Sequence, residues 1–331
     1  MIGKTIQAYF RLGRVHSAVL TGLAPVVTAA AVGVPLPLVH YVELFSIGAL
    51  FHLFLFIYNE VRDVSIDKAS KDLTHKPLVE GYISEKKAKA IVVSSFVLVF
   101  LFTLVFFFNQ AFILILLSLL AFLFGGLYDV FGKRIPHADY FIATMLFFVA
   151  LYGGFSVTST VSNFVYVIAL LAFTQMLINN IIAGLKDVDH DALAGGLSTP
   201  LRMHVGVEKG QLHISRSFAS YIVLLKIIHI ALTLIPFIYV MMSFQTWQLY
   251  AAVIIIGVSV CFLICFLTMK TFNRDSLMRV IGFHEMFAFM VVPVLLFSFI
   301  GSVAAIFLLI FPVIWLGVFL ILMYGRLMPA I

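Results

Sequence analysis

Apolar residues run almost without interruption for about twenty positions at a time along this chain, and charged or turn-forming residues separate the runs. A helix needs about 20 apolar residues to cross a bilayer core of about 30 Å. The pattern therefore predicts ten membrane-spanning helices. They cover residues 15–35, 41–61, 88–108, 110–131, 138–157, 163–185, 218–242, 247–269, 280–300 and 302–324.

The division between the last two runs rests on length. No charged residue lies between Glu285 and Arg326. A single helix over 282–324 would be about 64 Å long at 1.5 Å per residue, which is enough for two crossings. We therefore predict a break at Gly301-Ser302.

The composition indicates that most of the protein surface faces lipid rather than water. Of 331 residues, 63% are hydrophobic and 11% are charged, whereas soluble chains carry about 25% charged residues. This excludes a disordered, collagen-like, disulfide-scaffold or nucleic-acid-binding protein. Cys261 and Cys265 lie four residues apart in one apolar run, and we interpret them as small apolar side chains. The fold class that follows is all-α, a polytopic membrane helical bundle, and we expect one domain over 1–331.

Charge placement predicts the orientation of the bundle. With ten spans, every Lys and Arg except Lys226 falls on one side, and the alternate loops have none. Because Lys and Arg resist translocation, that side is the cytoplasm. Only Glu43 among the 15 acids lies toward the other side. We expect a retained first membrane helix, a cytoplasmic N-terminus and a site that faces the cytoplasm.

The first acidic cluster lies at the end of the second span. Asn59, Asp63 and Asp67 are spaced at i, i+4 and i+8. Side chains at this spacing share one face of a helix.

A second acidic cluster lies at the end of the sixth span. Asp187 and Asp191 are again four residues apart, and Asn180 precedes Asp187 by one heptad. Pro-Leu and then Gly follow both clusters, at 77–81 and 200–206, as a weak internal repeat. The repeat suggests two related helix pairs that face one shared site.

Both clusters have the chemistry of a magnesium site. Carboxylates that point the same way repel each other unless a cation neutralises them, and oxygen ligands suit Mg²⁺. Mg²⁺ takes one or two protein carboxylates and completes its shell with water and phosphate oxygens. Two such clusters could therefore hold one diphosphate, although acids that merely decorate solvated helix ends would give the same pattern.

These residues resemble the motifs of the UbiA superfamily of intramembrane prenyltransferases. Asn59, Asp63 and Asp67 are similar to its N-x-x-x-D-x-x-x-D motif, and Asp187, Asp191 and Gly195 to its second aspartate motif. The segment from Lys76 to Gly81 resembles R-P-[LI]-x-x-G, with Lys in place of Arg. The segment from Tyr128 to Arg134 resembles Y-S-x-x-L-K, with Asp129 where Ser is common. The resemblance covers residues 11–216.

The resemblance implies an enzyme that transfers a polyprenyl group from a polyprenyl diphosphate to a small acceptor, with Mg²⁺ as cofactor. It implies nine to ten transmembrane helices around a central cavity open to the cytoplasmic side. Asp63, Asp67, Asp187 and Asp191 are the expected catalytic residues, and with Asn59 they are the expected metal ligands. The expected diphosphate-binding residues are Asn59, Lys68, Lys76, Tyr128, Lys133, Arg134 and Arg202.

Asn180 and Lys226 are candidates for the acceptor pocket, because Lys226 is the single basic residue inside a span. A pairing of Lys226 with a carbonyl group of another helix is the alternative. An aromatic acid or quinone precursor is the first choice of acceptor, and a glycerol phosphate ether lipid precursor is the second. A terpene cyclase or elongating enzyme of the same family stays open. An ion-coupled membrane transporter is the alternative from another class, but its acids would lie near the bilayer midplane rather than at helix ends. Expected partners are the donor, a lipophilic or aromatic acceptor and membrane lipids, with no nucleic acid.

Overall fold

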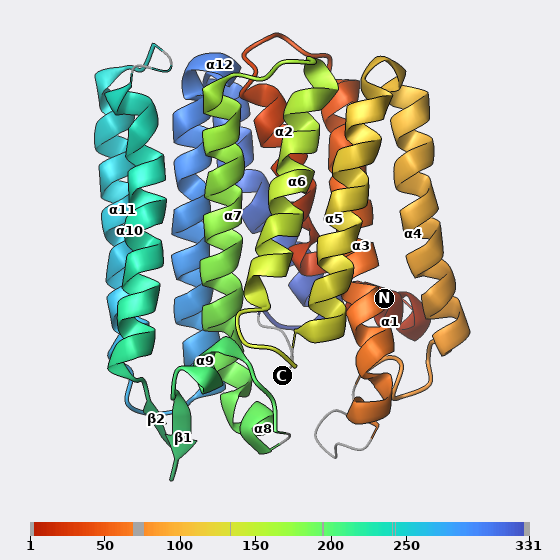
Figure 1. Cartoon of the computed structure of the whole chain (residues 1–331), viewed down its shortest axis with the longest axis vertical. Coiled ribbons are helices and arrows are strands. Elements are labelled where there is room, and N and C mark those ends of the chain that lie inside the picture. The colour runs from red at the N-terminus through yellow and green to blue at the C-terminus, as the bar shows by residue number, and fades with distance from the viewer. Residues whose placement is uncertain are drawn as a thin grey trace.

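The protein is a bundle of long, roughly parallel and antiparallel helices (Figure 1). The computed structural model describes residues 3–68, 76–132, 134–193, 195–239, 241 and 243–327. The long helices are α2 (Ala18–Ala30), α3 (Leu38–Asp67), α4 (Glu85–Phe106), α5 (Ala111–Phe131), α6 (Asp139–Val157), α7 (Asn163–Ala183), α10 (Arg216–Ile238), α11 (Thr246–Leu267) and α12 (Arg274–Tyr324). Short helices are α1 (Lys4–Leu12), α8 (Val188–Leu193) and α9 (Thr199–Arg202), with 3₁₀ turns η1 (Val15–Ser17), η2 (Phe108–Gln110) and η3 (Gly184–Asp187). The predicted helical membrane bundle is confirmed.

Helix α12 consists of two halves that meet at Gly301, where the sequence predicts a break. The backbone of Gly301 has φ 73° and ψ 176°, a conformation open to glycine and costly for other residues. The first half begins beside α8, where Arg274 binds Asp189, and the second half ends beside α1, where Gln7 binds the carbonyl of Met323. Both ends of α12 therefore lie at the same end of the bundle.

Eight helices in the described part of the chain are long and apolar enough to cross a membrane, counting α12 as one, and the helical segment Val15–Ala30 is shorter. The protein is an integral membrane protein. The number of crossings, and the side of the membrane that each end faces, stay predictions.

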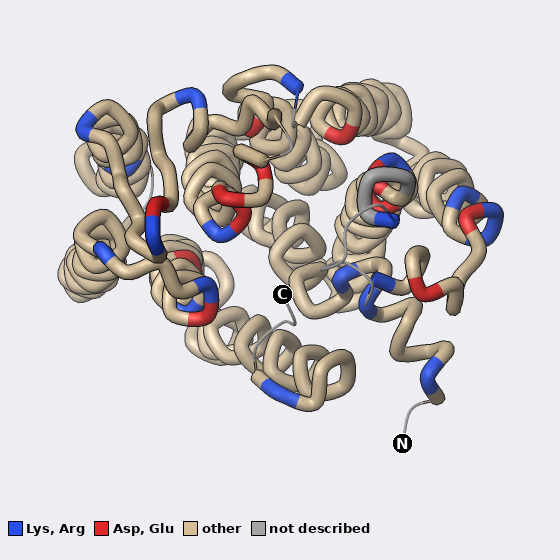
Figure 2. Tube along the Cα trace, turned by 90° about the horizontal axis from the view of Figure 1, so that it is seen from below, with Lys and Arg blue, Asp and Glu red and all other residues tan. Residues whose placement is uncertain are grey.

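One end of the bundle carries most of the connecting structure and charge. Figure 1 shows α1, α8, α9 and both described chain ends at the lower end of the helices. Figure 2, viewed from below, shows Lys, Arg, Asp and Glu distributed around this end. We call it the charged end, and both predicted acidic clusters lie there.

A small β-hairpin at the charged end departs from the all-helical expectation. Strands β1 (Gly206–Glu208) and β2 (Gln211–His213) pair antiparallel. Lys209 and Gly210 between them both have positive φ, 49° and 75°, as in the tight turns that join hairpin strands. The carbonyl of Lys270 accepts a hydrogen bond from the Leu212 amide at 2.8 Å. The hairpin thus joins the long loop after α9 to the α11–α12 connection.

Helices α2 and α6 pack at backbone contact in the centre of the bundle. A Cβ atom placed on Gly153 would lie 1.7 Å from the carbonyl oxygen of Pro25. One turn earlier on α2, a Cβ atom on Gly48 of α3 would lie 2.5 Å from the carbonyl oxygen of Thr21. Small residues that allow such close approach are typical of membrane helix interfaces.

Gly153→Ala is therefore expected to push α2 and α6 apart and to destabilise the bundle by about 1–3 kcal/mol. The matched control is Gly126→Ala in α5, where an added Cβ meets no atom within 4 Å. That change should be neutral or should stabilise the protein by up to about 1 kcal/mol, because alanine favours helix. Thermal unfolding in detergent measures both variants. Equal melting temperatures for the two would contradict the close contact.

Candidate active site

The first predicted acidic cluster lies on the last turns of α3. The helix continues through Asp67, so the predicted i, i+4, i+8 spacing falls on one continuous helix. Asn59 and Asp63 are partly buried there. The Asp67 side chain lies outside the described part of the chain.

Asp129, near the end of α5, adds a carboxylate to this cluster. Its side chain is buried, with 8% of the residue exposed. The Asn59 amide and the Asp63 carboxylate lie close enough to interact with it. Two helices therefore bring three oxygen-bearing side chains together.

Glu60 is the centre of a buried ion-pair network next to this cluster. Its two oxygens bind Arg14 Nη2 at 2.8 Å and Lys76 Nζ at 3.2 Å, and 6% of the residue is exposed. Arg14 also lies over the ring of Phe56, 5.1 Å from its centroid. Burial opposes the charge of Arg14, but the attraction of Glu60 outweighs it and raises the pKa of Arg14 above its ordinary value.

Arg14 reaches this position through an unusual backbone conformation. Its φ is 44°, between α1 and η1, and such values are uncommon outside glycine. The sequence predicts Arg14 only as one of many cytoplasmic cations. Its contact with Glu60 carries little sequence signal, because the two residues are 46 positions apart.

The second acidic cluster follows α7 in one continuous helical segment, Asn163–Leu193. Within it, α7 ends at Ala183, the 3₁₀ turn η3 follows up to Asp187, and α8 carries Asp191. The tighter winding of η3 changes the direction of the cluster relative to α7. The same-face arrangement of Asp187 and Asp191 stays a prediction, which the α-helical residues between them support.

Arg274 at the start of α12 holds this second segment in place. Its Nη2 binds the two oxygens of Asp189 at 2.8 and 2.6 Å, and its Nε donates to the carbonyl of Lys186 at 3.0 Å. Asp187 pairs with Lys186 Nζ at 2.6 Å. Arg274 thus ties η3 and α8 to α12, a contact that the sequence analysis misses.

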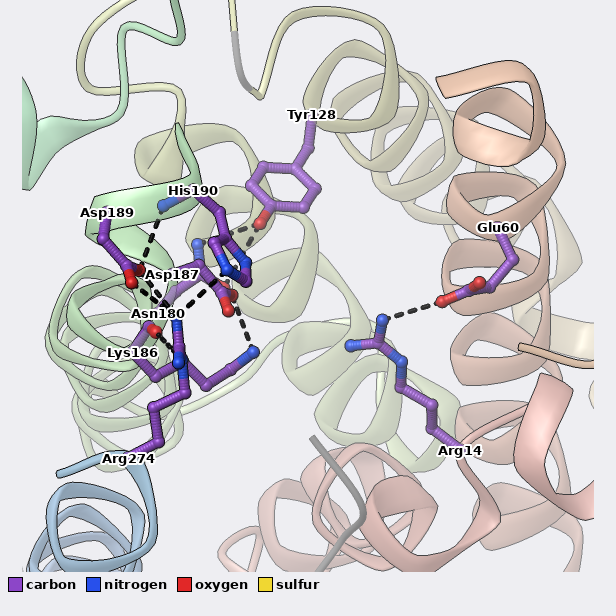
Figure 3. A network of polar contacts seen from close by, with 9 residues as sticks. All are labelled: Arg14, Glu60, Tyr128, Asn180, Lys186, Asp187, Asp189, His190 and Arg274. Atoms are coloured by element: carbon purple, nitrogen blue, oxygen red, sulfur yellow. Dashed lines mark hydrogen bonds and ion pairs between the residues drawn. The ribbon is translucent and has the colours of Figure 1, made fainter. Parts of the chain in front are cut away.

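A second network joins Tyr128 of α5 to α6, α7 and α9. Asn180 Nδ2 donates to the Tyr128 hydroxyl at 3.1 Å and to Asp139 Oδ1 at 2.6 Å. The Thr199 hydroxyl donates to the other oxygen of Asp139. The Tyr128 hydroxyl is thereby fixed beside α7, which leads to the second acidic segment. Figure 3 shows the Tyr128, Asp187 and Arg274 side chains on one side and the Arg14–Glu60 pair on the other.

The remaining predicted residues are more dispersed. Lys68 pairs with Glu85 at 3.1 Å in an exposed position, and Arg134 and Arg202 are exposed. Lys133 lies outside the described residues. Lys226 is buried and donates to the Ser259 hydroxyl at 2.7 Å. In the described ranges, no three His, Cys, Asp or Glu side chains converge as a ready metal site.

Solved structures of several membrane proteins share this fold. One described as digeranylgeranylglyceryl phosphate synthase in membranes aligns with a TM-score of 0.66 and 17% identity, over 90% of this chain and 100% of that chain. A UbiA homolog from Aeropyrum pernix K1 aligns with a TM-score of 0.64 and 15% identity, over 86% and 98%. A UbiA homolog from Archaeoglobus fulgidus bound to DMAPP and Mg²⁺ aligns with a TM-score of 0.60 and 18% identity, over 86% and 98%. The fold is that of an intramembrane bundle of the UbiA type.

The family follows from the sequence. The model of the UbiA prenyltransferase family matches residues 18–291, so the chain belongs to that family and is a prenyltransferase. A search of curated proteins finds no match.

The Glu60 network yields a stability prediction. Glu60→Ala should leave two cations beside a buried space and lower the free energy of unfolding by about 1–3 kcal/mol. Screening by solvent reduces this loss of unfolding free energy, because the Arg14 side chain is 40% exposed. Glu85→Ala is the control, because it breaks a pair whose side chains are 51% and 41% exposed and should change stability by less than about 0.5 kcal/mol. Thermal unfolding in detergent compares them, and a Glu60 variant as stable as the Glu85 variant would contradict the network.

Proposed function

We propose that this prenyltransferase transfers a polyprenyl group from a polyprenyl diphosphate, bound with Mg²⁺, to a small aromatic acceptor or quinone precursor. The observation that supports this is the position of both aspartate segments at the charged end, with Tyr128 on the same side as Asp187 in Figure 3. Cations lie among the acids, as recognition of a metal diphosphate requires.

The donor set suits Mg²⁺ better than a softer metal. The candidate ligands Asn59, Asp63, Asp67, Asp187 and Asp191 offer only carboxylate and amide oxygens. The absence of a converging triad among the described side chains is compatible with Mg²⁺, which takes one or two carboxylates per ion and shares the phosphate oxygens. When bound, Mg²⁺ stabilises the negative charge that develops on the leaving diphosphate.

The cations of the site have a separate role. Lys76 is held by Glu60, and Lys186 is held by Asp187. Fixed cations cost little reorganisation when a diphosphate arrives, so they can stabilise its charge in the transition state. Lys68, Lys133, Arg134 and Arg202 complete the proposed phosphate-binding set.

The aromatic side chains protect the reacting carbon. Cleavage of the allylic C–O bond gives the electron pair to the diphosphate and leaves an allylic cation that water would quench. The fixed ring of Tyr128 presents a π face near the second acidic segment. Such faces stabilise cations.

A glycerol phosphate ether lipid precursor is the second candidate acceptor. It is favoured by the fold shared with the structure described as digeranylgeranylglyceryl phosphate synthase. Incubation of the purified protein with a labelled prenyl diphosphate and both kinds of acceptor decides between them, and a protein that transfers to neither would contradict the proposal.

Asp63→Ala and Asp187→Ala should each abolish prenyl transfer, because each removes a carboxylate that would hold Mg²⁺ against the diphosphate. The control is Glu208→Ala, an exposed acid on β1 at the same end, which should keep its rate. Turnover with saturating Mg²⁺ is measured, together with thermal unfolding to check the fold. Near-normal rates in both aspartate variants would mean that the acids only decorate solvated helix ends.

Lys133→Ala should lower kcat/KM by about tenfold to a hundredfold, the loss expected for one charge-assisted hydrogen bond. Lys133→Arg should recover part of the rate, since the charge persists with another geometry. Lys270→Ala is the control, because Lys270 is a cation of the α11–α12 connection without a motif match. Equal small losses in Lys133→Ala and Lys270→Ala would make Lys133 only a topological anchor.

A further inference from the structure

A pocket that none of the motif residues line opens inside the bundle. It lies between α2, α6, α7, α10 and α12, and its cavity volume is about 70 Å³. Most of its lining is apolar, with Gln175, His229 and Glu285 as the polar exceptions. Neither Asn180 nor Lys226, which the sequence analysis assigns to the acceptor, lines it.

Gln175 has hydrogen-bonding capacity that the protein does not use. Neither Nε2 nor Oε1 of its amide has a partner in the described part of the chain, and both atoms are buried. Asn179 lies one helical turn further along α7, and its Oδ1 is also buried and without a partner there. An unsatisfied buried amide costs free energy, so these atoms need a ligand or water.

The other polar groups of the pocket have fixed positions. Asn179 Nδ2 donates to Glu285 Oε1 at 3.0 Å, which holds the carboxyl group of α12 against α7. His229 Nδ1 lies 2.9 Å from the Thr174 hydroxyl. Two helices thus present an amide and a carboxyl group at preset positions beside an apolar space.

The charge of the pocket limits what can bind. No Lys or Arg is among its lining residues, and the nearby Lys226 is committed to Ser259. A carboxylate or phosphate would lie near Glu285 without a compensating cation, which is costly at low dielectric. A neutral hydroxyl group avoids this cost and can accept from Gln175 Nε2 while it donates to an oxygen of the pocket.

Building on the proposed function, we propose that this pocket binds the acceptor, as a neutral ring that bears a hydroxyl group, through Gln175 and Glu285, with Asn179 holding Glu285 in position. The apolar lining contacts the ring. The pocket adjoins the candidate active site through consecutive residues of α7, because Asn179 binds Glu285 and Asn180 binds Tyr128. This assignment favours phenols and hydroquinones over acceptors whose head group is an anion.

The hydrocarbon chain of the donor is the competing occupant. It would match the apolar lining, but it would leave the Gln175 amide without a partner in a dry pocket. Kinetics separate the two occupants. Gln175→Met keeps a similar shape and removes both hydrogen-bonding atoms. It should raise KM for the acceptor by about tenfold and leave KM for the prenyl diphosphate unchanged. A rise in KM for the donor alone would assign the pocket to the prenyl chain and overturn the proposal.

Ser118→Ala is the control for the kinetic experiment. Ser118 is buried in α5, outside the pocket, and bonds only to the Leu114 carbonyl of its own helix. Both KM values should be unchanged in this variant. Thermal unfolding should show that the Gln175→Met and Ser118→Ala proteins are both folded.

Binding without the donor or Mg²⁺ separates this inference from the proposed function. Hydroquinone and 4-hydroxybenzoate share a phenol and differ in the carboxylate, and calorimetry on the wild-type protein should give tighter binding of hydroquinone. Gln175→Met should weaken hydroquinone binding by about tenfold. Hydroquinone binding that this variant leaves unchanged, or tighter binding of 4-hydroxybenzoate, would overturn the inference. A protein that binds hydroquinone through Gln175 but transfers no prenyl group would retain the pocket and refute the proposed function.

Discussion

The constraint that shapes this protein is the cost of charge in lipid. A bundle in which only 11% of residues are charged must place its charges where water or a partner compensates them. The protein places most of them at one end, and within that end it pairs buried ones. Glu60 is the clearest case, because one carboxylate holds two cations that come from distant parts of the chain. The positions of Arg14 and Lys76, and hence the charge around the acids of α3, depend on that carboxylate.

Hydrophobic runs and local spacing predict the parts of this structure that depend on nearby residues. The approximate positions of the long helices, the Gly301 break and the placement of Asn59 and Asp63 on one helix all follow from positions within a few turns of each other. The 3₁₀ turn η3 after α7 is not predicted, because it depends on a tertiary contact. Arg274, 88 positions away, binds the Lys186 carbonyl and secures that turn.

Motif residues can likewise be identified from nearby positions in the sequence, whereas the residues that position them depend on tertiary contacts. Motif spacing identifies Asn180 but assigns it to the acceptor, whereas its amide fixes Tyr128 and Asp139. Asp139 itself carries no sequence signal, because its role depends on three helices that meet at the charged end. Gln175 and Glu285 likewise lie in apolar runs, where an isolated polar residue has no periodic pattern to mark it. Only the packed structure shows that both face one pocket.

The C-terminal half of α12 lies beyond the residues that the family model matches, yet it supports the candidate site. Trp315 Nε1 donates to the Val15 carbonyl at 2.8 Å, and Gln7 Nε2 donates to the Met323 carbonyl at 2.8 Å. These bonds hold the chain on both sides of Arg14, whose positive φ needs such support. This half of α12 therefore extends the polar network outward. It fixes the backbone that carries Arg14 to Glu60, and Glu60 in turn holds Lys76 beside the first acidic cluster.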